Sequence, residues 1–156
     1  MTKVLGTNVG ALVAKSGFAG VSDFNKDSNA RVLVRDFGGM TAANVIGDQF
    51  SLGFYKSGSY LDPLSWLWFD AFGGTCTLNI GDASFPSGLA SAIAIAAAGN
   101  AAAWKGFAAS KMGMPLWKAL GYAADPQTTI ELLATIATSN VANTANLAWQ
   151  ILGISR

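Results

Sequence analysis

The most regular pattern in the chain is Thr129-Ile130-Glu131-Leu132-Leu133-Ala134-Thr135-Ile136, in which Ile130, Leu132, Ala134 and Ile136 alternate onto one side. This alternation is typical of a β-strand with one buried face. A second strand pattern follows the polar stretch 139–146, and it places Leu147, Trp149 and Ile151 on one face. Two such strands joined by a polar loop predict an antiparallel hairpin.

Strand patterns also precede this predicted hairpin, at residues 31–37, 50–56 and 75–80. Glycine-containing turns separate them, at Gly38-Gly39, Ser57-Gly58-Ser59, Gly73-Gly74 and Gly81-Asp82. In the first strand Val32 and Val34 alternate with Leu33, and Phe37 follows. In the second, Phe50, Leu52 and Phe54 are expected to share a buried face. In the third, Cys76, Leu78 and Ile80 share a face.

Two further segments have other patterns. Residues 88–103 are rich in alanine, and Leu89, Ile93 and Ala96 or Ala97 would share one face of a helix that Gly99-Asn100 interrupts. We expect a short helix there, because alanine has the highest helix propensity. Residues 113–122 fit either a short helix starting at Pro115 or a strand.

Short strands separated by glycine-rich turns favour a sandwich or jelly roll over a parallel α/β sheet. We therefore predict a mainly β chain, with a single antiparallel β-sandwich or jelly-roll-like domain over residues 30–156. The alanine-rich helix would be its one helical insertion. Residues 1–29, rich in Gly, Ser, Asn and Asp, are expected to form an extended N-terminal arm.

The surface is expected to be unusually neutral. Hydrophobic residues make up 51% of the 156 residues and charged residues only 12%, about half the ~25% usual in soluble domains. The ten basic residues form no run, so we expect no direct contact with nucleic acid. The longest apolar run, residues 89–98, is too short to span a membrane, and the N-terminus does not resemble a secretory signal. We expect cytoplasmic synthesis and a surface covered by copies or partners.

The sequence offers little catalytic chemistry. It contains no histidine, which excludes Ser-His and Cys-His nucleophiles and histidine metal sites. Its single cysteine, Cys76, is expected to be a buried structural thiol. A short oxygen-rich turn at residues 79–84 has too few acidic ligands for calcium. We therefore expect no catalytic residue, no cofactor and no metal site.

A carboxylate pair is the remaining enzymatic possibility, because glycoside hydrolysis needs only two acids and a platform for the sugar. The candidate acids are Asp62, Asp70, Asp82, Asp125 and Glu131. Each aspartate adjoins a turn, where aspartate bonds its own backbone, so a turn-forming role is favoured. Trp66 and Trp68 alternate onto one face and could form the platform, but packing in the core or at a subunit interface is favoured.

Four segments stand in a distinctive order ahead of the closing hairpin: Asn29-Ala30-Arg31-Val32, Ser51-Leu52-Gly53-Phe54-Tyr55, Gly74-Thr75-Cys76-Thr77-Leu78-Asn79-Ile80-Gly81-Asp82 and Gly121-Tyr122-Ala123-Ala124-Asp125-Pro126. Together they resemble a group of small virion proteins of tailed bacteriophages. The likeness extends over residues 29–154. Leu52-Gly53-Phe54-Tyr55 stands where the group more usually has Gly-Leu-Tyr.

The resemblance implies a non-enzymatic β-sandwich protein of the virion, a capsid decoration (cement) protein first and a neck, tail or fibre component as an alternative. Expected partners are further copies of the chain, with a trimer favoured, and the major capsid protein or another virion protein. Candidate interface residues are Trp66 and Trp68 in the domain and Leu12 and Phe18 in the arm. A carbohydrate-binding module or small glycosidase on a β-sandwich is the alternative from another class.

Overall fold

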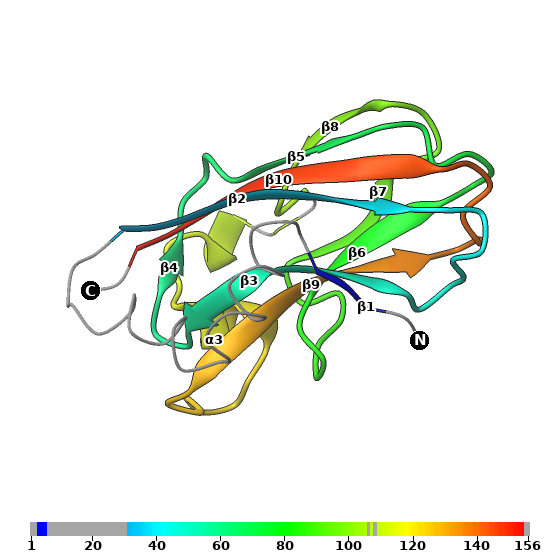
Figure 1. The fold of residues 1–156 in the computed structure, drawn as a ribbon. Coiled ribbons are helices and arrows are strands. Elements are labelled where there is room, and N and C mark those ends of the chain that lie inside the picture. Colours follow the sequence, from blue (N-terminus) through cyan, green and yellow to red (C-terminus); the bar gives the residue numbers. More distant parts are fainter. Residues whose placement is uncertain (1–2, 6–30, 106, 108, 155–156) are drawn as a thin grey trace.

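The computed structural model describes residues 3–5, 31–105, 107 and 109–154, which form two β-sheets packed face to face (Figure 1). Sheet A contains, in spatial order, β1 (Lys3–Leu5), β3 (Gln49–Lys56), β9 (Thr129–Ala137), β6 (Thr77–Gly81) and β7 (Ala90–Ala94). Sheet B contains β2 (Arg31–Met40), β10 (Ala145–Ile154), β5 (Trp66–Phe69) and β8 (Gly99–Ala102), and the short β4 (Tyr60–Leu61) also pairs with β10. The predicted mainly β sandwich is confirmed.

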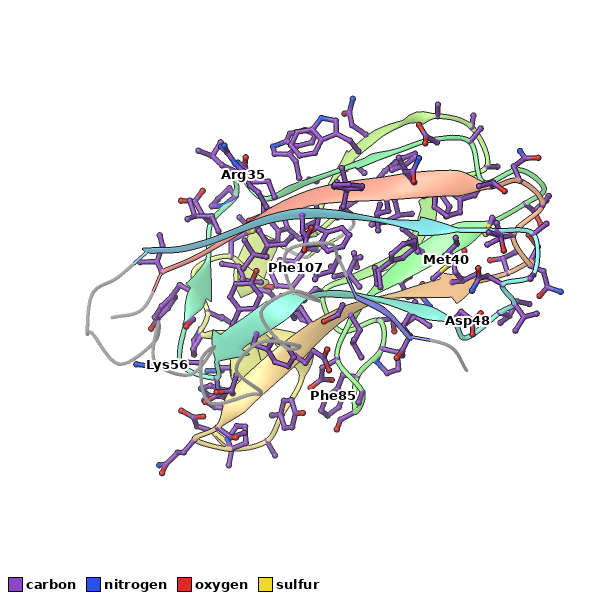
Figure 2. All side chains as sticks on the ribbon, viewed as in Figure 1. Arg35, Met40, Asp48, Lys56, Phe85 and Phe107 are labelled. Atoms are coloured by element: carbon purple, nitrogen blue, oxygen red, sulfur yellow. The ribbon has the colours of Figure 1, made fainter. Side chains whose placement is uncertain are left out.

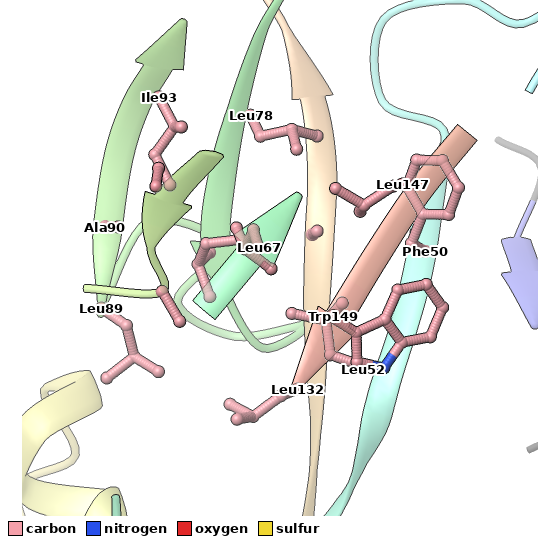
Figure 3. Close-up of a cluster of buried hydrophobic side chains, with 14 of the residues drawn as sticks. Phe50, Leu52, Leu67, Leu78, Leu89, Ala90, Ile93, Leu132, Leu147 and Trp149 are labelled. Carbon is pink, nitrogen blue, oxygen red and sulfur yellow. The ribbon is translucent and has the colours of Figure 1, made fainter. Parts of the chain in front are cut away.

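The core lies between the two sheets, and in β5 and β10 it is built from alternate residues of the strand. On β2, Met40 points between the sheets and Arg35 points outward (Figure 2). On β3 and β10, the rings of Phe50 and Trp149 meet edge to face with centroids 6.3 Å apart (Figure 3). The inward positions predicted for the last two strands are confirmed, since these side chains are all buried: Ile130, Leu132, Ala134, Ile136, Leu147, Trp149 and Ile151.

The predicted hairpin between the last two strands is wrong. β9 pairs with β3 and β6 in sheet A, whereas β10 pairs with β2, β4 and β5 in sheet B. The connection between them therefore crosses from one sheet to the other. Each strand has a single face rich in large apolar side chains, and crossing the sandwich lets both faces be buried against each other.

A β-bulge changes the alternation expected for β3. The pairing of β3 with β9 shifts register between Ser51 and Gly53, and Gly53 has φ of 120°, which favours glycine. After the bulge the inward side chain is Tyr55, which joins Phe50 and Leu52 in the core cluster. Phe54, expected to share their face, is buried but lies outside that cluster.

The helix expected over residues 88–103 is also wrong. This segment forms β7, which pairs with β6, and β8, which pairs with β5. Ile93 and Ile95 are both buried two positions apart, which is the period of a strand. The small alanine side chains tolerate either structure, so tertiary pairing outweighs their helix propensity.

The ambiguous segment 113–122 contains the short helix α3 (Leu116–Leu120), preceded by the 3-10 turn η1 (Ala109–Lys111). Pro115 occupies the N-cap position of α3, and Gly121 ends the helix with φ of 119°. Leu116, Ala119 and Leu120 are buried against the sandwich. In the described residues no helix has the length and hydropathy that crossing a membrane requires.

Of the predicted arm, residues 1–29, the structure describes only Lys3–Leu5. Residues Lys3–Leu5 form β1, which pairs in parallel with Gln49–Ser51 of β3. The remainder of the predicted arm lies outside the described residues, and so do the interface candidates Leu12 and Phe18.

Tyr55 provides a test of this core through the pH dependence of stability. Burial raises the pKa of Tyr55 well above its ordinary value. Between the unfolded pKa of about 10 and the higher folded pKa, the unfolded chain loses a proton that the folded chain keeps. The free energy of unfolding should therefore fall with rising pH in that window, by up to about 1.4 kcal/mol per pH unit, and be unaffected by this group at lower pH.

Urea unfolding between pH 8 and pH 11.5 measures this effect. Tyr55→Phe should make the decline above about pH 10 shallower. Tyr60→Phe, at a partly exposed tyrosine, serves as the matched control. Identical slopes for wild type and Tyr55→Phe would contradict the prediction.

Candidate functional site

The outer face of sheet B carries exposed aromatic side chains. Along β5 the residues alternate in exposure, so that Leu67 and Phe69 point into the core and Trp66 and Trp68 point outward. Trp66 is 37% exposed and Trp68 is 44% exposed. Phe37, on the outward side of β2, is 53% exposed. The expectation that both indoles share a face is confirmed, and they are not core residues.

Strand register arranges the outward residues in rows across the sheet. In one row Phe37 lies opposite Ala148, which lies opposite Trp68, which lies opposite Asn100. In the next row the order is Arg35, Gln150, Trp66 and Ala102. Residues directly opposite each other in antiparallel strands project from the same face. The face therefore brings together residues that are more than a hundred positions apart in the sequence.

A shallow groove runs over β10 between the two aromatic strands. Its volume is about 310 Å³, and its lining includes Phe37, Ala148 and Trp68. Ala148 forms a low floor because its side chain is a single methyl group, and the rings on either side form the walls. Such a groove can hold a flat or apolar group, and burial of that group would remove both rings from water.

Polar groups occur at both ends of this groove. At one end the Arg35 Nε donates to Gln150 Oε1 at 2.8 Å. At the other end Asn146 donates to Asp70 Oδ2 from both its backbone N, at 3.1 Å, and its Nδ2, at 2.9 Å. The middle of the face is therefore apolar, and its ends are polar, which is the arrangement of a binding surface with a dry centre and a wet rim.

The five carboxylates considered for catalysis each accept hydrogen bonds at separate places. Asp62 accepts from the Leu64 N, Asp70 from Asn146, Asp82 from the Ser84 and Phe85 backbone N, Asp125 from the Gln127 N and the Ser57 hydroxyl, and Glu131 from the Ser51 hydroxyl. The three bonds from Leu64, Ser84 and Gln127 to an aspartate two residues earlier are the turn-forming interactions expected for aspartate. None of these bonds joins two of the carboxylates.

The turn at residues 79–84 has a structural role in the fold. Asn79 Oδ1 accepts from the Ala92 N at 2.9 Å, and Asp82 Oδ2 accepts from the Tyr122 hydroxyl at 2.5 Å. The hydrogen bond to Asp82 is the main cause of the raised pKa of Tyr122. No group of three or more acidic or cysteine side chains that could hold a metal occurs among the described residues.

Cys76 is fully buried, as expected of a structural thiol. Burial is the largest cause of its raised pKa, and the raised pKa lowers the fraction of reactive thiolate.

The sequence pattern identified Trp66 and Trp68 but not the rest of the site. Phe37, Ala148 and Asn100 reach this face only through the pairing of β2, β10, β5 and β8. The strand pattern of residues 31–37 and 147–152 shows which side of each strand a residue occupies. It gives no information on which strands are neighbours, so no local signal could have placed these residues beside the indoles.

In comparisons with protein-family models, with curated proteins and with solved structures, nothing matches this chain.

Proposed function

We propose that this chain is a non-enzymatic structural protein of a tailed-phage virion, acting as a capsid decoration protein that binds copies of itself and the capsid shell. The observation that carries the proposal is the outer face of sheet B, where Phe37, Trp66 and Trp68 are exposed together. Exposed aromatic clusters with a polar rim mark surfaces that bind other macromolecules. The resemblance of residues 29–154 to small virion proteins supplies the class of assembly.

The hydrogen bonds that the carboxylates accept support a binding role over a catalytic one. Glycoside hydrolysis requires two acids roughly 5–10 Å apart on either side of a sugar. Here Glu131 bonds Ser51 on sheet A, whereas Asp70 bonds Asn146 on sheet B. Each carboxylate stabilises a turn or joins neighbouring segments by a hydrogen bond, which is a structural role.

The test is the location of the chain in purified particles of the phage that encodes it. Gradient-purified virions should contain the chain by mass spectrometry, and gold-labelled antibodies against it should decorate the shell. Label on the neck, tail or fibres would instead support the alternative virion role. Absence from purified particles, when the chain is abundant in the infected lysate, would refute the proposal.

A carbohydrate-binding module is the second candidate, and the exposure of Trp66 and Trp68 favours it. Flat apolar rings can stack on the faces of sugar rings, and Asn100 lies beside Trp68 as a polar group that can bond a sugar hydroxyl. A glycan array with the wild type and Trp68→Ala separates this candidate from the first. Specific binding to one glycan class that disappears in Trp68→Ala would favour carbohydrate recognition.

A further inference from the structure

The central row of the outer face of sheet B alternates between large and small side chains. Across the central row the side chains are large, small, large and small, in the order Phe37, Ala148, Trp68, Asn100. The neighbouring row ends in the same way, with the large Trp66 on β5 beside the small Ala102 on β8. In the central row β2 and β5 therefore form ridges, and β10 and β8 form the depressions beside them, whereas in the neighbouring row β10 carries the longer Gln150.

We propose that the occupant of this face is a second copy of the chain, packed face to face about a two-fold axis that runs parallel to the strands between β10 and β5. In this dimer Trp68 of each copy lies over Ala148 of the other. The inference rests on the proposed function and deepens it, because it names the partner of the exposed face and the residues that meet there.

The spacing of the strands fits this arrangement. Neighbouring strands lie about 4.8 Å apart, so the ridges on β2 and β5 are separated by about 10 Å. That width leaves room for one aromatic side chain between Phe37 and Trp68, over the methyl group of Ala148. The two-fold axis that places each β5 over the other β10 also places each β2 over the other β8. Phe37 of each copy then lies over Asn100 of the other.

The position of Arg35, the charged side chain on these two rows, is also compatible with this dimer. The same axis places Arg35 of one copy over the small Ala102 of the other, beside Trp66. A guanidinium beside an indole is a favourable cation–π arrangement. Because β8 is the edge strand of sheet B, this charge stays at the rim of the interface and remains hydrated.

The three exposed aromatic side chains would form the centre of this interface, and the surrounding residues of sheet B would have to supply most of its area. If a fully exposed aromatic side chain presents about 200 Å², the exposed parts of Phe37, Trp66 and Trp68 amount to roughly 270 Å² per copy. A standard interface buries about 800 Å² per partner, and a central aromatic cluster provides most of its binding energy. An isologous contact of this kind closes at two copies, so it leads to a dimer and not to the three-fold ring expected from the sequence.

The experiment is a bump-and-hole exchange, with light scattering and sedimentation equilibrium on the full chain. Wild type should be a dimer. Ala148→Trp fills the groove and should weaken self-association by at least about 30-fold, and Trp68→Ala removes the ridge and should also weaken it. An equimolar mixture of the two variants should form a heterodimer. The tryptophan introduced at position 148 of one variant then meets the alanine introduced at position 68 of the other, while the reciprocal contact stays native.

Ala94→Trp is the matched control, since it adds the same bulk at an exposed strand position of sheet A and should leave the dimer intact. Circular dichroism melts establish that each variant is folded. A monomeric wild type, a trimer, or a mixture that fails to associate would overturn the two-fold arrangement. The virion test separates the two: a monomeric chain found in purified particles would refute this dimer and leave the virion role standing, and a dimer absent from particles would refute the virion role.

Discussion

Replacing Gly81 with alanine should destabilise the fold by at least about 3 kcal/mol, because the new methyl group would collide with backbone atoms. A Cβ built on Gly81 would lie 1.9 Å from the carbonyl oxygen of Phe85 and 2.7 Å from the carbonyl carbon of Pro86. The loop cannot easily move away, since Asp82 Oδ1 accepts from the backbone N of Ser84 and Phe85. Relief of the collision would break these bonds or the pairing of Gly81 with Leu133.

Gly58→Ala is the control for this substitution. A Cβ at Gly58 would meet nothing within 4 Å, so its effect should stay below about 1 kcal/mol. Urea denaturation of both variants measures the difference. Equal urea midpoints for Gly81→Ala and Gly58→Ala would contradict the prediction, because the loop after β6 would then move aside without a loss of stability.

The second large effect is expected at Leu67. This side chain is fully buried on β5 between the outward Trp66 and Trp68, and its truncation to alanine should cost about 2–5 kcal/mol through lost burial and the cavity left behind. Leu64→Ala removes the same atoms from a side chain that is 63% exposed, three residues earlier, and should change stability by less than about 1 kcal/mol. Urea denaturation of the two variants measures both changes. Similar losses in the two variants would contradict the alternation of β5 and, with it, the outward placement of the indoles.

The sequence predicted those parts of the fold in which one strand determines its own pattern. Alternation along residues 129–136 and 147–152 gave the buried faces correctly, because a strand with one core face must repeat every two residues. It also gave the common face of Trp66 and Trp68. These are local properties of each strand, and they do not depend on which strands lie alongside it.

The errors occur where non-local pairing decides the structure. A polar connection such as residues 138–144 can join two strands of one sheet or cross between two sheets, and nothing in its composition distinguishes the two. The alanines of residues 88–103 have helix propensity, yet their small size also lets Ala101 and Ala103 lie buried beside larger core residues. The bulge at Gly53 reverses the expected face of Phe54, and a single glycine within a strand pattern does not specify such a shift.

The candidate site depends even more on pairing. Two of its ring walls come from β2 and β5, and its floor comes from β10, so it exists only when three distant segments are assembled. The indoles alone suggested an interface or a sugar platform. The low floor at Ala148, between the rings of Phe37 and Trp68, is what makes this face a groove.

The position of β10 in sheet B has a consequence for how the protein forms during synthesis. β10 lies between β2 and β5, and the Arg35–Gln150 contact that joins it to β2 spans 115 positions of the chain. Until β10 leaves the ribosome, β2 and β5 have no neighbour between them, and their apolar faces stay open to chaperones and to other nascent chains. Because closing such long loops is slow, sheet B should form after sheet A and be the step at which crowded synthesis leads to aggregation.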